Sequence, residues 1–512
     1  MLVRVVAAVG ALVLVGAGVV LARAQLYEVP VPAAPSIVAS PPQWADGTTT
    51  RTSPSPAAAA DATPAALPSP QPAPVAVPEP PTTPEQRLQL RLARILGRST
   101  TGGRVGLAVL DAEGHAIFGD AAGRPMIPAS TQKLPVAAAA LSRLGTDFRY
   151  VTTVHATALP DAAGVVDGDL VLVGGGDPTL AGPEFARIEP SRPLTPLAAL
   201  ARRIKRAGIT RVRGRILGDP TIFADEPVAA GWLPRYFDHL DTTRSSGLTV
   251  DKGRRLFRKG GTLRAVPAED PAHQAARSLR RLLRDRGVAV KGRAVALRAS
   301  VPTATEVASI RSPAMGRLLR YMVQRSDNHL ADAIFRTLGS AEGDSTWIGS
   351  AGAVATTLTP LQLDWDGVVL ADGSGLSRAN RVSPAFLAQL QSRMWRSNLR
   401  EQWHRLLAVA AESGTLRYRF RDTVAAQRIF GKTGSLRDVV ALVGTVVGPA
   451  ERLLHFAFTG NRVGSTSDMR ALTDRAVVAM AEELYECRRV RPPGRTKKGK
   501  RRASRLVCAA GG

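Results

Sequence analysis

The chain has 512 residues, with 68 lysines and arginines against 42 aspartates and glutamates, a formal net charge of +26 and two cysteines. This length allows two or three domains, and a hydrophobic fraction of 45% is ordinary for a protein with a sizeable core. The basic balance predicts polyanionic partners, but by itself it excludes none of nucleic acid, anionic lipid and an acidic envelope polymer.

The N-terminus has the pattern of an export segment. Arg4 precedes residues 5–22, an uncharged run of valine, alanine, leucine and glycine, and a positive start before an apolar stretch marks export through a membrane. Ala-Arg-Ala at residues 22–24 forms a small-x-small cleavage site, while the run also approaches the length that spans a bilayer. Residues 1–27 are therefore predicted to be a signal peptide or a membrane anchor. Either one places the protein in the extracytoplasmic cell envelope, secreted or anchored, and argues against nucleic acid as a partner.

The next segment, residues 28–83, is rich in proline, alanine, serine and threonine. Such a composition buries too little apolar surface to offset the entropy of ordering the chain, so a disordered tether is predicted. Folded sequence begins at Thr83 and Pro84, which give the capping residue and N1 proline of a helix start. Alternating apolar residues then predict strands over 106–110 and 115–119.

An alanine-rich helix is predicted to follow residues 128–133 and to run through Leu144. Residues 150–304 differ in texture, with short valine-rich strands, many glycines and one strong helix at 197–208. We predict one or more inserted domains there, between a first part (84–149) and a second part (305–486) of another domain. The second part is predicted to contain helices over 314–338 and 383–395, a hairpin of strands over 439–447 and 453–459, and a last helix ending near Tyr485.

The C-terminal tail, residues 487–512, is strongly basic. Residues 488–505 carry 10 lysines or arginines and no acidic residue. The plain interpretation is a solvated tail, and the functional one is a salt-sensitive contact with anionic wall polymers or lipid headgroups. Cys487 and Cys508 flank this stretch, and in an exported protein they either pair or remain two free thiols.

Ser130 and Lys133 form the first motif with chemical content. Residues three apart on a helix share a face, so the ammonium group of Lys133 can lie beside the hydroxyl of Ser130. A serine hydroxyl is a weak nucleophile until a base removes its proton. Lysine can be that base only when burial or nearby positive charge lowers its pKa. Alone, this spacing is common by chance.

Two further motifs follow. Ser-Asp-Asn at 326–328 lies inside the predicted helix and offers a second hydroxyl and an amide that can hold a carbonyl group. Lys-Thr-Gly at 432–434 precedes an apolar run and is predicted to lie at a strand edge, where lysine and threonine can bind a carboxylate through charge-assisted hydrogen bonds. Each motif is weak by itself, but Ser-x-x-Lys, Ser-x-Asn and Lys-Thr-Gly together are the signature of penicillin-binding proteins and class A β-lactamases.

On these motifs the chain resembles the low-molecular-mass class C penicillin-binding proteins, which are D-alanyl-D-alanine carboxypeptidases and endopeptidases. Stretches at 168–180 and 372–378 also look like that family, and the resemblance covers about residues 84–486. Ser130 and Ser326 are 196 residues apart, and class C proteins resemble this chain in inserting extra domains there.

The resemblance implies an α+β fold, namely a serine β-lactamase or penicillin-binding-protein-like domain with an antiparallel sheet flanked by helices and a large inserted domain. It implies that Ser130 attacks the bond between two D-alanine residues, with Lys133 as the base and Ser326 as a proton relay. The substrate-binding residues that it implies are Asn328, Lys432, Thr433, Gly434 and Ser435. It implies no cofactor and no metal, and its partners are peptidoglycan stem peptides and β-lactam antibiotics.

Finer roles follow from the same resemblance. Lys432 is expected to lower the pKa of Lys133 by charge repulsion, and the backbone N–H groups of Ser130 and Ser435 to form an oxyanion hole. The glycine-rich loop at 372–378 is interpreted as a structural turn rather than as catalytic.

Three other functions are less well supported. A Ser-His-Asp hydrolase needs a Gly-x-Ser-x-Gly elbow and a metal enzyme needs clustered ligands, and the sequence has neither. A β-lactamase shares all three motifs, but no Glu-x-x-x-Asn element lies between Ser326 and Lys432. A non-catalytic wall-binding protein on this fold is expected to have lost a motif residue, and every motif residue is present.

Overall fold

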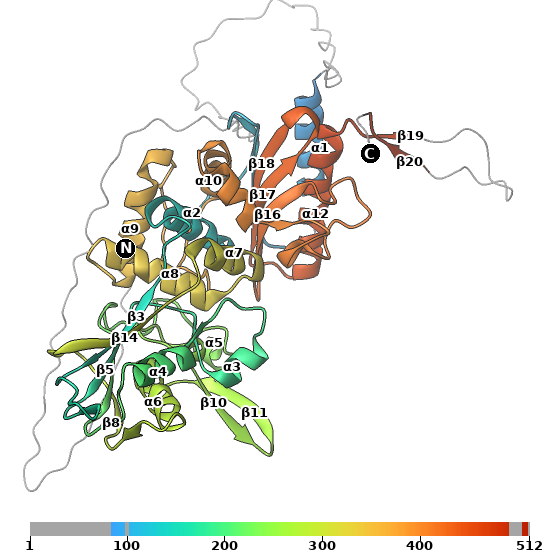
Figure 1. Cartoon of the computed structure of the whole chain (residues 1–512). Coiled ribbons are helices and arrows are strands. Elements are labelled where there is room, and N and C mark those ends of the chain that lie inside the picture. Colours follow the sequence, from blue (N-terminus) through green and yellow to red (C-terminus); the bar gives the residue numbers. More distant parts are fainter. Residues whose placement is uncertain (1–82, 98–101, 491–503, 510–512) are drawn as a thin grey trace, which may run out of the picture. The chain divides into compact units, whose positions relative to one another are not determined.

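The structure, a computed structural model, describes residues 83–97, 102–490 and 504–509. A six-stranded antiparallel sheet with the strand order β15-β16-β17-β18-β1-β2 runs through one half of it (Figure 1). The strands are β1 (Arg104–Leu110), β2 (Ala116–Asp120), β15 (Ala408–Val409), β16 (Ile429–Leu436), β17 (Val439–Val447) and β18 (Leu453–Asn461). The hairpin expected from the sequence is β17 and β18. Because β1 pairs with β18, the first and second parts of the chain complete one sheet.

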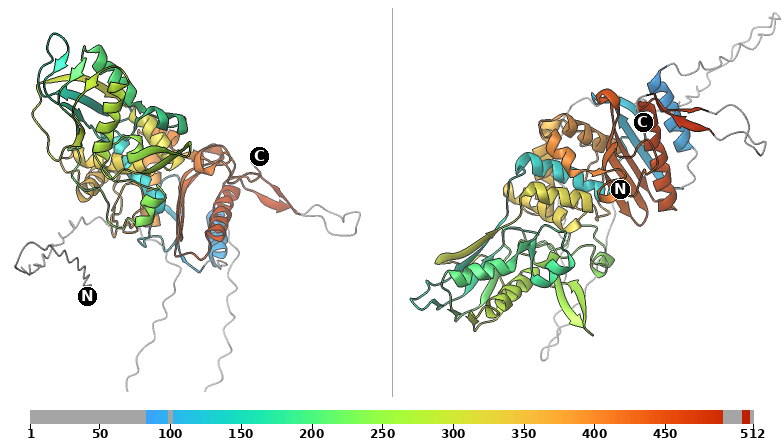
Figure 2. Two further views of the ribbon diagram at one scale, coloured as in Figure 1. Left: turned by 90° about the horizontal axis from the view of Figure 1, so that it is seen from below. Right: turned by 45° about the vertical axis from the view of Figure 1, so that its right-hand side comes forward.

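Helices α1 (Pro84–Gly97) and α12 (Thr466–Leu484) contact each other and lie on one face of this sheet (Figures 1 and 2). α1 begins where the sequence predicted, because Oγ1 of Thr83 accepts a hydrogen bond from the backbone N–H of Gln86 at 3.1 Å, as an N-cap does. The apolar face of α1 joins the core between these helices and the sheet.

A layer of helices covers the opposite face of the sheet (Figure 2). Within it α10 (Pro384–Arg396) packs directly on β1, β17 and β18, and α2 (Lys133–Arg143) is buried along most of its length. The other helices of the layer are α7 (Met315–Arg325), α8 (Asn328–Ala341), α9 (Trp347–Leu358) and α11 (Arg400–Leu406). This arrangement is the predicted antiparallel sheet flanked by helices.

Between α2 and α7 the chain forms a second group of sheets and helices, which we call the insert (residues 151–311). Its main sheet has the order β13-β9-β5-β3-β14, in which β14 (Thr305–Arg311) pairs antiparallel with β3 (Val151–Ala156). β14 begins just past the boundary predicted at residue 304, and its pairing with β3 joins it to the main sheet of the insert. The local composition of the sequence did not predict this pairing, because β3 and β14 are far apart in the chain.

The insert buries an apolar cluster of its own, and helices α4 and α6 contact each other over its main sheet. Its remaining elements are β4 (Val165–Val166), β5 (Leu170–Val173), β6 (Leu180–Ala181), α3 (Pro183–Ile188), β7 (Thr195–Pro196), α4 (Leu197–Arg206), β8 (Arg211–Val212), β9 (Ile216–Asp219), α5 (Pro234–Asp238), β10 (Arg254–Lys259), β11 (Thr262–Pro267), α6 (Pro271–Arg284), β12 (Ala289–Val290) and β13 (Ala294–Ala296).

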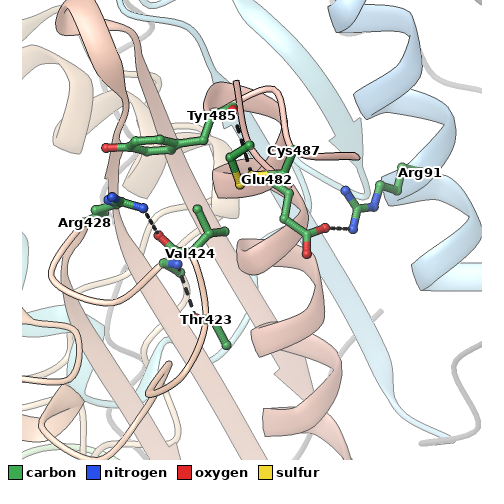
Figure 3. The surroundings of a disulfide bond; sticks show 9 residues. Arg91, Thr423, Val424, Arg428, Glu482, Tyr485 and Cys487 are labelled. Carbon is green, nitrogen blue, oxygen red and sulfur yellow. Dashed lines mark hydrogen bonds and ion pairs between the residues drawn. A yellow bond between two sulfur atoms is a disulfide. The ribbon is translucent and has the colours of Figure 1, made fainter. Parts of the chain in front are cut away.

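Near the C-terminus, Cys487 and Cys508 form a disulfide (Figure 3). Of the two alternatives that the sequence left open, pairing is the one that the structure shows. Strands β19 (Arg488–Val490) and β20 (Arg505–Val507) pair antiparallel beside it. Most of the basic stretch between the two cysteines, residues 491–503, lies outside the described residues.

The disulfide follows directly on α12, whose last turns are tied to other elements (Figure 3). Glu482 forms an ion pair with Arg91 of α1. The guanidinium of Arg428 lies 3.9 Å from the ring centroid of Tyr485, a cation–π contact. The end of α12 is therefore held at both α1 and the segment that leads into β16.

The predicted export segment (residues 1–27) and the predicted tether (28–83), apart from Thr83, lie outside the described residues. Among the helices that the structure does describe, none combines the length and the apolar character needed to cross a bilayer.

Candidate active site

Ser130 lies in a single 3-10 turn, Ala129–Gln132, that leads directly into α2. Lys133 is the first residue of α2, and this spacing places its Nζ 3.0 Å from Oγ of Ser130. Pro135 falls in the first turn of α2, where the missing N–H is tolerated. Ala129, just before Ser130, has a left-handed φ of 48°. A non-glycine residue holds such a conformation only when its surroundings fix it.

The Lys133 side chain is fully buried and has three polar neighbours. Its Nζ donates to Oγ of Ser130 at 3.0 Å, to Oδ1 of Asn328 at 2.8 Å and to the carbonyl oxygen of Ser374. The last two oxygens can only accept. A neutral lysine has two N–H hydrogens and one lone pair, so when these two acceptors take the hydrogens, the lone pair remains for the hydroxyl hydrogen of Ser130. The arrangement therefore suits a lysine that acts as a base toward this serine.

Electrostatics also favour the neutral form of this lysine. Burial lowers the pKa of Lys133 from 10.5 to about 8, although the carboxylates of Asp332, Asp372 and Asp327 oppose the shift. The expectation that Lys432 is the cause is therefore wrong, because the main cause is lost hydration. The two amines do interact: burial, and then repulsion by Lys133, lower the pKa of Lys432 well below its ordinary value.

The Ser326-Asp327-Asn328 segment, called the SDN segment below, lies between two helices. The prediction of one continuous helix over residues 314–338 is therefore wrong, since α7 ends just before Ser326 and α8 begins at Asn328. Ser326 is left-handed, with φ 57° and ψ 41°. Helices that end on a left-handed residue usually have glycine or asparagine there, so a serine gives no such signal in the sequence.

The helix break lets both polar residues of this segment reach the site. Oγ of Ser326 accepts a hydrogen bond from Nζ of Lys432 at 3.0 Å, while Asn328 contacts Lys133. In an unbroken helix, side chains two residues apart diverge by about 200°. Nδ2 of Asn328 also donates to the carbonyl oxygen of Asp241, which the insert contributes, at 2.9 Å.

Lys-Thr-Gly at 432–434 lies on β16, as predicted. In the described part of the chain these residues pair only with β17, because the short β15 ends beside the two residues before them, so this stretch is a strand edge. Nζ of Lys432 also donates to the carbonyl oxygen of Thr433 at 2.6 Å. A Cβ on Gly434 would lie 2.8 Å from the carbonyl oxygen of Pro128, so glycine lets the strand pack directly on the turn that holds Ser130.

The remaining site residues lie toward solvent. Thr433 is half-buried, and its Oγ1 donates to Oγ1 of Thr415 at 2.9 Å. Ser435 is exposed, and Nη2 of Arg470 lies 3.5 Å from its Oγ. Neither Thr415 nor Arg470 belongs to a motif, so sequence analysis gave no signal for them.

Sequence analysis also missed Asp332, a fully buried carboxyl behind Lys133. Its Oδ1 accepts the backbone N–H groups of Gly373 and Ser374 at 3.1 and 2.8 Å. Burial, and then the charge of Asp372, raise the pKa of Asp332 well above its ordinary value. A signal did exist, because this residue follows Asn328 by four positions and shares its face of α8.

Asp372 has the contacts of a structural turn, the interpretation that the sequence favoured. The side chain is fully buried, and its two oxygens together accept bonds from five groups. These are Gly375 N, Asn380 Nδ2, Ser374 Oγ, Ser377 N and Trp232 Nε1, the last at 2.8 Å. The turn in this way presents the carbonyl of Ser374 to Lys133.

Within the described ranges, one group of side chains has the spacing of metal ligands, namely Asp111, Glu113 and His115. It lies in the exposed turn between β1 and β2, not among the residues around Ser130. His115 already bonds Asp111 through its ring, at 3.2 Å, and through its backbone N–H, at 2.7 Å.

The chain matches the model of the D-Ala-D-Ala carboxypeptidase 3 (S13) family over residues 88–259 and 258–483. It is 32% identical over 417 residues to Carboxypeptidase DacB of Mycolicibacterium smegmatis, covering 80% of this chain and 85% of that protein. It is 29% identical over 452 residues to the D-alanyl-D-alanine carboxypeptidase of Actinomadura sp. (strain R39), covering 74% and 81%. The crystal structure of penicillin binding protein 4 (dacB) from Haemophilus influenzae superposes with a TM-score of 0.67 at 21% identity, covering 77% and 99%, which shows the fold.

Gly375→Ala is expected to disrupt the turn of Ser130. Gly375 has φ 81°, and an added Cβ would lie 1.9 Å from the carbonyl oxygen of Ala129. Strain and clash together should lower the free energy of unfolding by roughly 2 kcal/mol or more. Gly352→Ala, at an exposed position of α9 with open space around it, should instead raise it by about 0.5–1 kcal/mol. Chemical denaturation measures both, and equal effects would contradict this account.

Proposed function

The chain belongs to the D-Ala-D-Ala carboxypeptidase 3 (S13) family, and from this premise we propose which of its residues carry out the reaction. It is a serine-type D-alanyl-D-alanine carboxypeptidase, a low-molecular-mass class C penicillin-binding protein. The observation that most supports the residue assignment is the contact between Ser130 and the buried amine of Lys133.

Ser130 is the nucleophile and Lys133 is its base. Oγ of Ser130 attacks the carbonyl carbon of the bond between two D-alanine residues, while Nζ of Lys133 takes the hydroxyl proton. Ser326 relays a proton to the departing amine, so the C–N bond breaks and the terminal D-alanine leaves. Water then hydrolyses the acyl-enzyme, which releases the shortened peptide and regenerates the serine. The hydrogen bond from Lys432 to Ser326 supports this relay.

The backbone N–H groups of Ser130 and Ser435 form the oxyanion hole, a contribution of about 3–4 kcal/mol per donor in other acyl-transfer enzymes. Lys432 and Thr433 bind the terminal carboxylate. Asn328 holds the amide oxygen of the substrate through Nδ2, which now donates to a backbone carbonyl of the insert. When the substrate binds, its carbonyl oxygen takes the place of the Asp241 carbonyl oxygen as the acceptor of this hydrogen bond.

The substrates are peptidoglycan stem peptides, and β-lactam antibiotics acylate the same serine. A β-lactam-bound structure of penicillin binding protein 4 from Haemophilus influenzae shares this fold, with a TM-score of 0.63. The relatives named above are carboxypeptidases, and no observation favours a β-lactamase or a non-catalytic wall-binding protein.

Labelled penicillin is expected to form a covalent adduct with Ser130, and the protein is expected to release D-alanine from a stem pentapeptide. Ser130→Ala should abolish both, because it removes the hydroxyl that contacts Nζ of the buried lysine. The matched control Ser467→Ala, at an exposed position on α12, should retain both. Peptide mass mapping locates the adduct. An unlabelled wild type, or a labelled Ser130→Ala protein, would refute the assignment.

Mass spectrometry of muropeptides from the same reactions separates the two peptidase activities. Loss of one terminal D-alanine reports carboxypeptidase action, and conversion of cross-linked dimers to monomers reports endopeptidase action.

The acylation rate is expected to rise with pH and to level off above about pH 8. Only neutral Lys133 can accept the proton, and the pKa of this group is lowered to about 8. Below that value the neutral fraction grows about tenfold per pH unit, whereas a lysine with an ordinary pKa would extend the rise to about pH 10.4. Stopped-flow acylation across this range tests it. A rate that is flat through neutral pH, or one that still climbs above pH 9, would exclude this lysine as the base.

We also propose that the protein acts outside the cytoplasm, exported by residues 1–27, and that its basic tail contacts anionic wall polymers. The composition of residues 488–505 supports the tail contact, and the disulfide between Cys487 and Cys508 closes this stretch into a covalent loop.

Replacing Lys497, Lys498 and Lys500 with glutamine is expected to weaken retention on isolated cell walls at about 0.01 M salt. At about 1 M salt the wild type and the variant should elute alike, because screening shortens the reach of charges from about 30 Å to about 3 Å. Binding to vesicles that contain anionic lipid is measured in parallel, so that lipid headgroups can be distinguished from wall polymers. Equal retention of the variant and the wild type on cell walls at low salt would contradict the proposal.

A further inference from the structure

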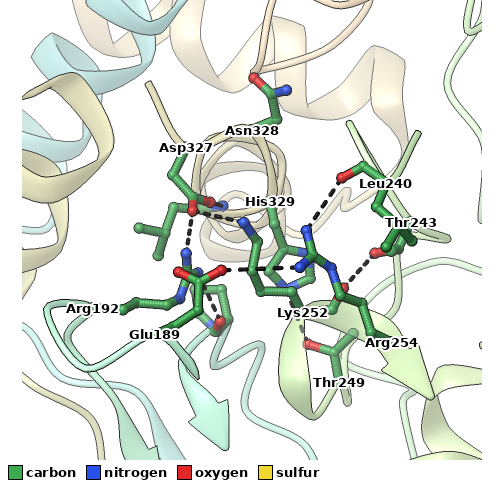
Figure 4. A network of polar contacts seen from close by, with 12 residues as sticks. Glu189, Arg192, Leu240, Thr243, Thr249, Lys252, Arg254, Asp327, Asn328 and His329 are labelled. Carbon is green, nitrogen blue, oxygen red and sulfur yellow. Dashed lines mark hydrogen bonds and ion pairs between the residues drawn. The ribbon is translucent and has the colours of Figure 1, made fainter. Parts of the chain in front are cut away.

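Asp327, the middle residue of the SDN segment, is buried, and its carboxylate accepts hydrogen bonds or ion pairs from three groups (Figure 4). Its Oδ1 caps α8 by accepting the backbone N–H of Leu330 at 2.9 Å. Its Oδ2 receives Nη1 of Arg192 and, at 3.0 Å, Nζ of Lys252. Burial by itself raises the pKa of this carboxyl, and the charges of Arg192 and Lys252, followed by the backbone N–H of Leu330, are the leading causes that bring it below its ordinary value. Asp327 is therefore ionised, with two cations on one oxygen.

Both cations come from the insert, on separate loops. Arg192 lies between α3 and β7, and its side chain is 0% exposed. Its guanidinium also donates to the carbonyl oxygen of Pro178 and lies 5.6 Å from the ring centroid of Tyr321, on α7. Lys252 lies in the turn just before β10. The loops of the insert and the ends of α7 and α8 therefore meet at one carboxylate.

Backbone strain is concentrated on both sides of this contact. Ser326 has φ 57°, and across from it Asp251 and Lys252 have φ 56° and 60°. Left-handed non-glycine residues of this kind cost energy and persist only where the surroundings hold them. On the insert side, Oδ1 of Asp251 accepts the backbone N–H of Gly182 at 2.7 Å and so fixes that turn. The ion pair between Lys252 and Asp327 joins this turn to the residue that follows Ser326.

The neighbouring groups complete a connected network (Figure 4). Arg254 lies 3.9 Å from Glu189 and donates to the carbonyl oxygen of Leu240 at 3.2 Å. Leu240 precedes Asp241, whose carbonyl contacts Asn328. His329 is half-buried beside them, with its Nε2 3.3 Å from Oγ1 of Thr249, and loss of hydration is the main cause that lowers its pKa to about 3. His329 is therefore neutral and adds no positive charge that would compete with Arg192 and Lys252 for Asp327.

We propose that Arg192 and Lys252 are positioning residues for acylation, whose ion pairs with Asp327 hold Ser326 in its left-handed conformation with its hydroxyl on Lys432. This inference rests on the proposed function. It concerns Ser326 more than Asn328, because Asn328 is the first residue of α8 and the helix itself holds its backbone. Ser326 is the C-cap of α7, and its backbone N–H donates to the carbonyl oxygen of Met322, but its left-handed conformation leads directly into Asp327, so the placement of its hydroxyl also depends on how Asp327 is held.

The test is a double-mutant cycle on the acylation of Ser130 by labelled penicillin. Arg192→Met should slow acylation about 10- to 100-fold in the wild-type background, the range that a misplacement of about 1 Å produces. In a Ser326→Ala background the same substitution should slow it less than about 3-fold, because the group that it positions is already gone. A general loss of stability would instead give the same factor in both backgrounds, and that result would overturn the proposal.

Two further variants make the test complete. Lys252→Met keeps the contact between Arg192 and Asp327, and it takes the place of Arg192→Met if that variant does not fold. It too should slow acylation in the wild-type background and have little effect in the Ser326→Ala background. Arg215→Met is the matched control, since it removes an exposed ion pair with Asp169 inside the insert, and it should leave acylation unchanged. Unchanged acylation in both Arg192→Met and Lys252→Met would also overturn the proposal. Failure of the wild type itself to be acylated would instead refute the proposed function.

Discussion

The structure depends on the removal of one amine from water. A lysine ammonium is strongly hydrated, and the fold surrounds that of Lys133 with protein on every side, so the neutral form gains relative to the charged one. Two acceptor-only oxygens then orient the nitrogen and leave its lone pair for Ser130. Each of these oxygens belongs to a different element, one at the start of α8 and one in the 372–378 turn. The helical layer and the 372–378 turn together therefore favour the neutral form of Lys133.

The same site is assembled by close backbone approaches rather than by long side chains. β16 can lie against the turn of Ser130 because Gly434 has no Cβ to collide with Pro128. The left-handed residues Ala129 and Ser326 bring the ends of α2 and α7 to the same place. Conformations of this kind are costly and persist only where the surrounding structure holds them, and at Ala129 the 372–378 turn does so by packing Gly375 against its carbonyl oxygen.

Local patterns predicted much of this. The start of α1, the β17–β18 hairpin and the Ser130–Lys133 pair each follow from residues close together in the sequence, where spacing and capping chemistry are informative. The three motifs also identified which remote segments meet. What the sequence did not show depends on contacts between distant residues. The break at Ser326 has no glycine to mark it, Asp332 acquires its setting only from the 372–378 turn, and β14 is assigned to the insert only by its pairing with β3.

The pairing of β3 with β14 means that the chain leaves the insert beside the point where it enters. The insert therefore connects two neighbouring positions of the sheet-and-helix domain, as a loop does. The entropic cost of closing a loop grows only slowly with its length. Insertions into the outer loops of this region therefore add little to the cost of folding, whereas the loss of Arg192 or Lys252 would expose Asp327 to solvent.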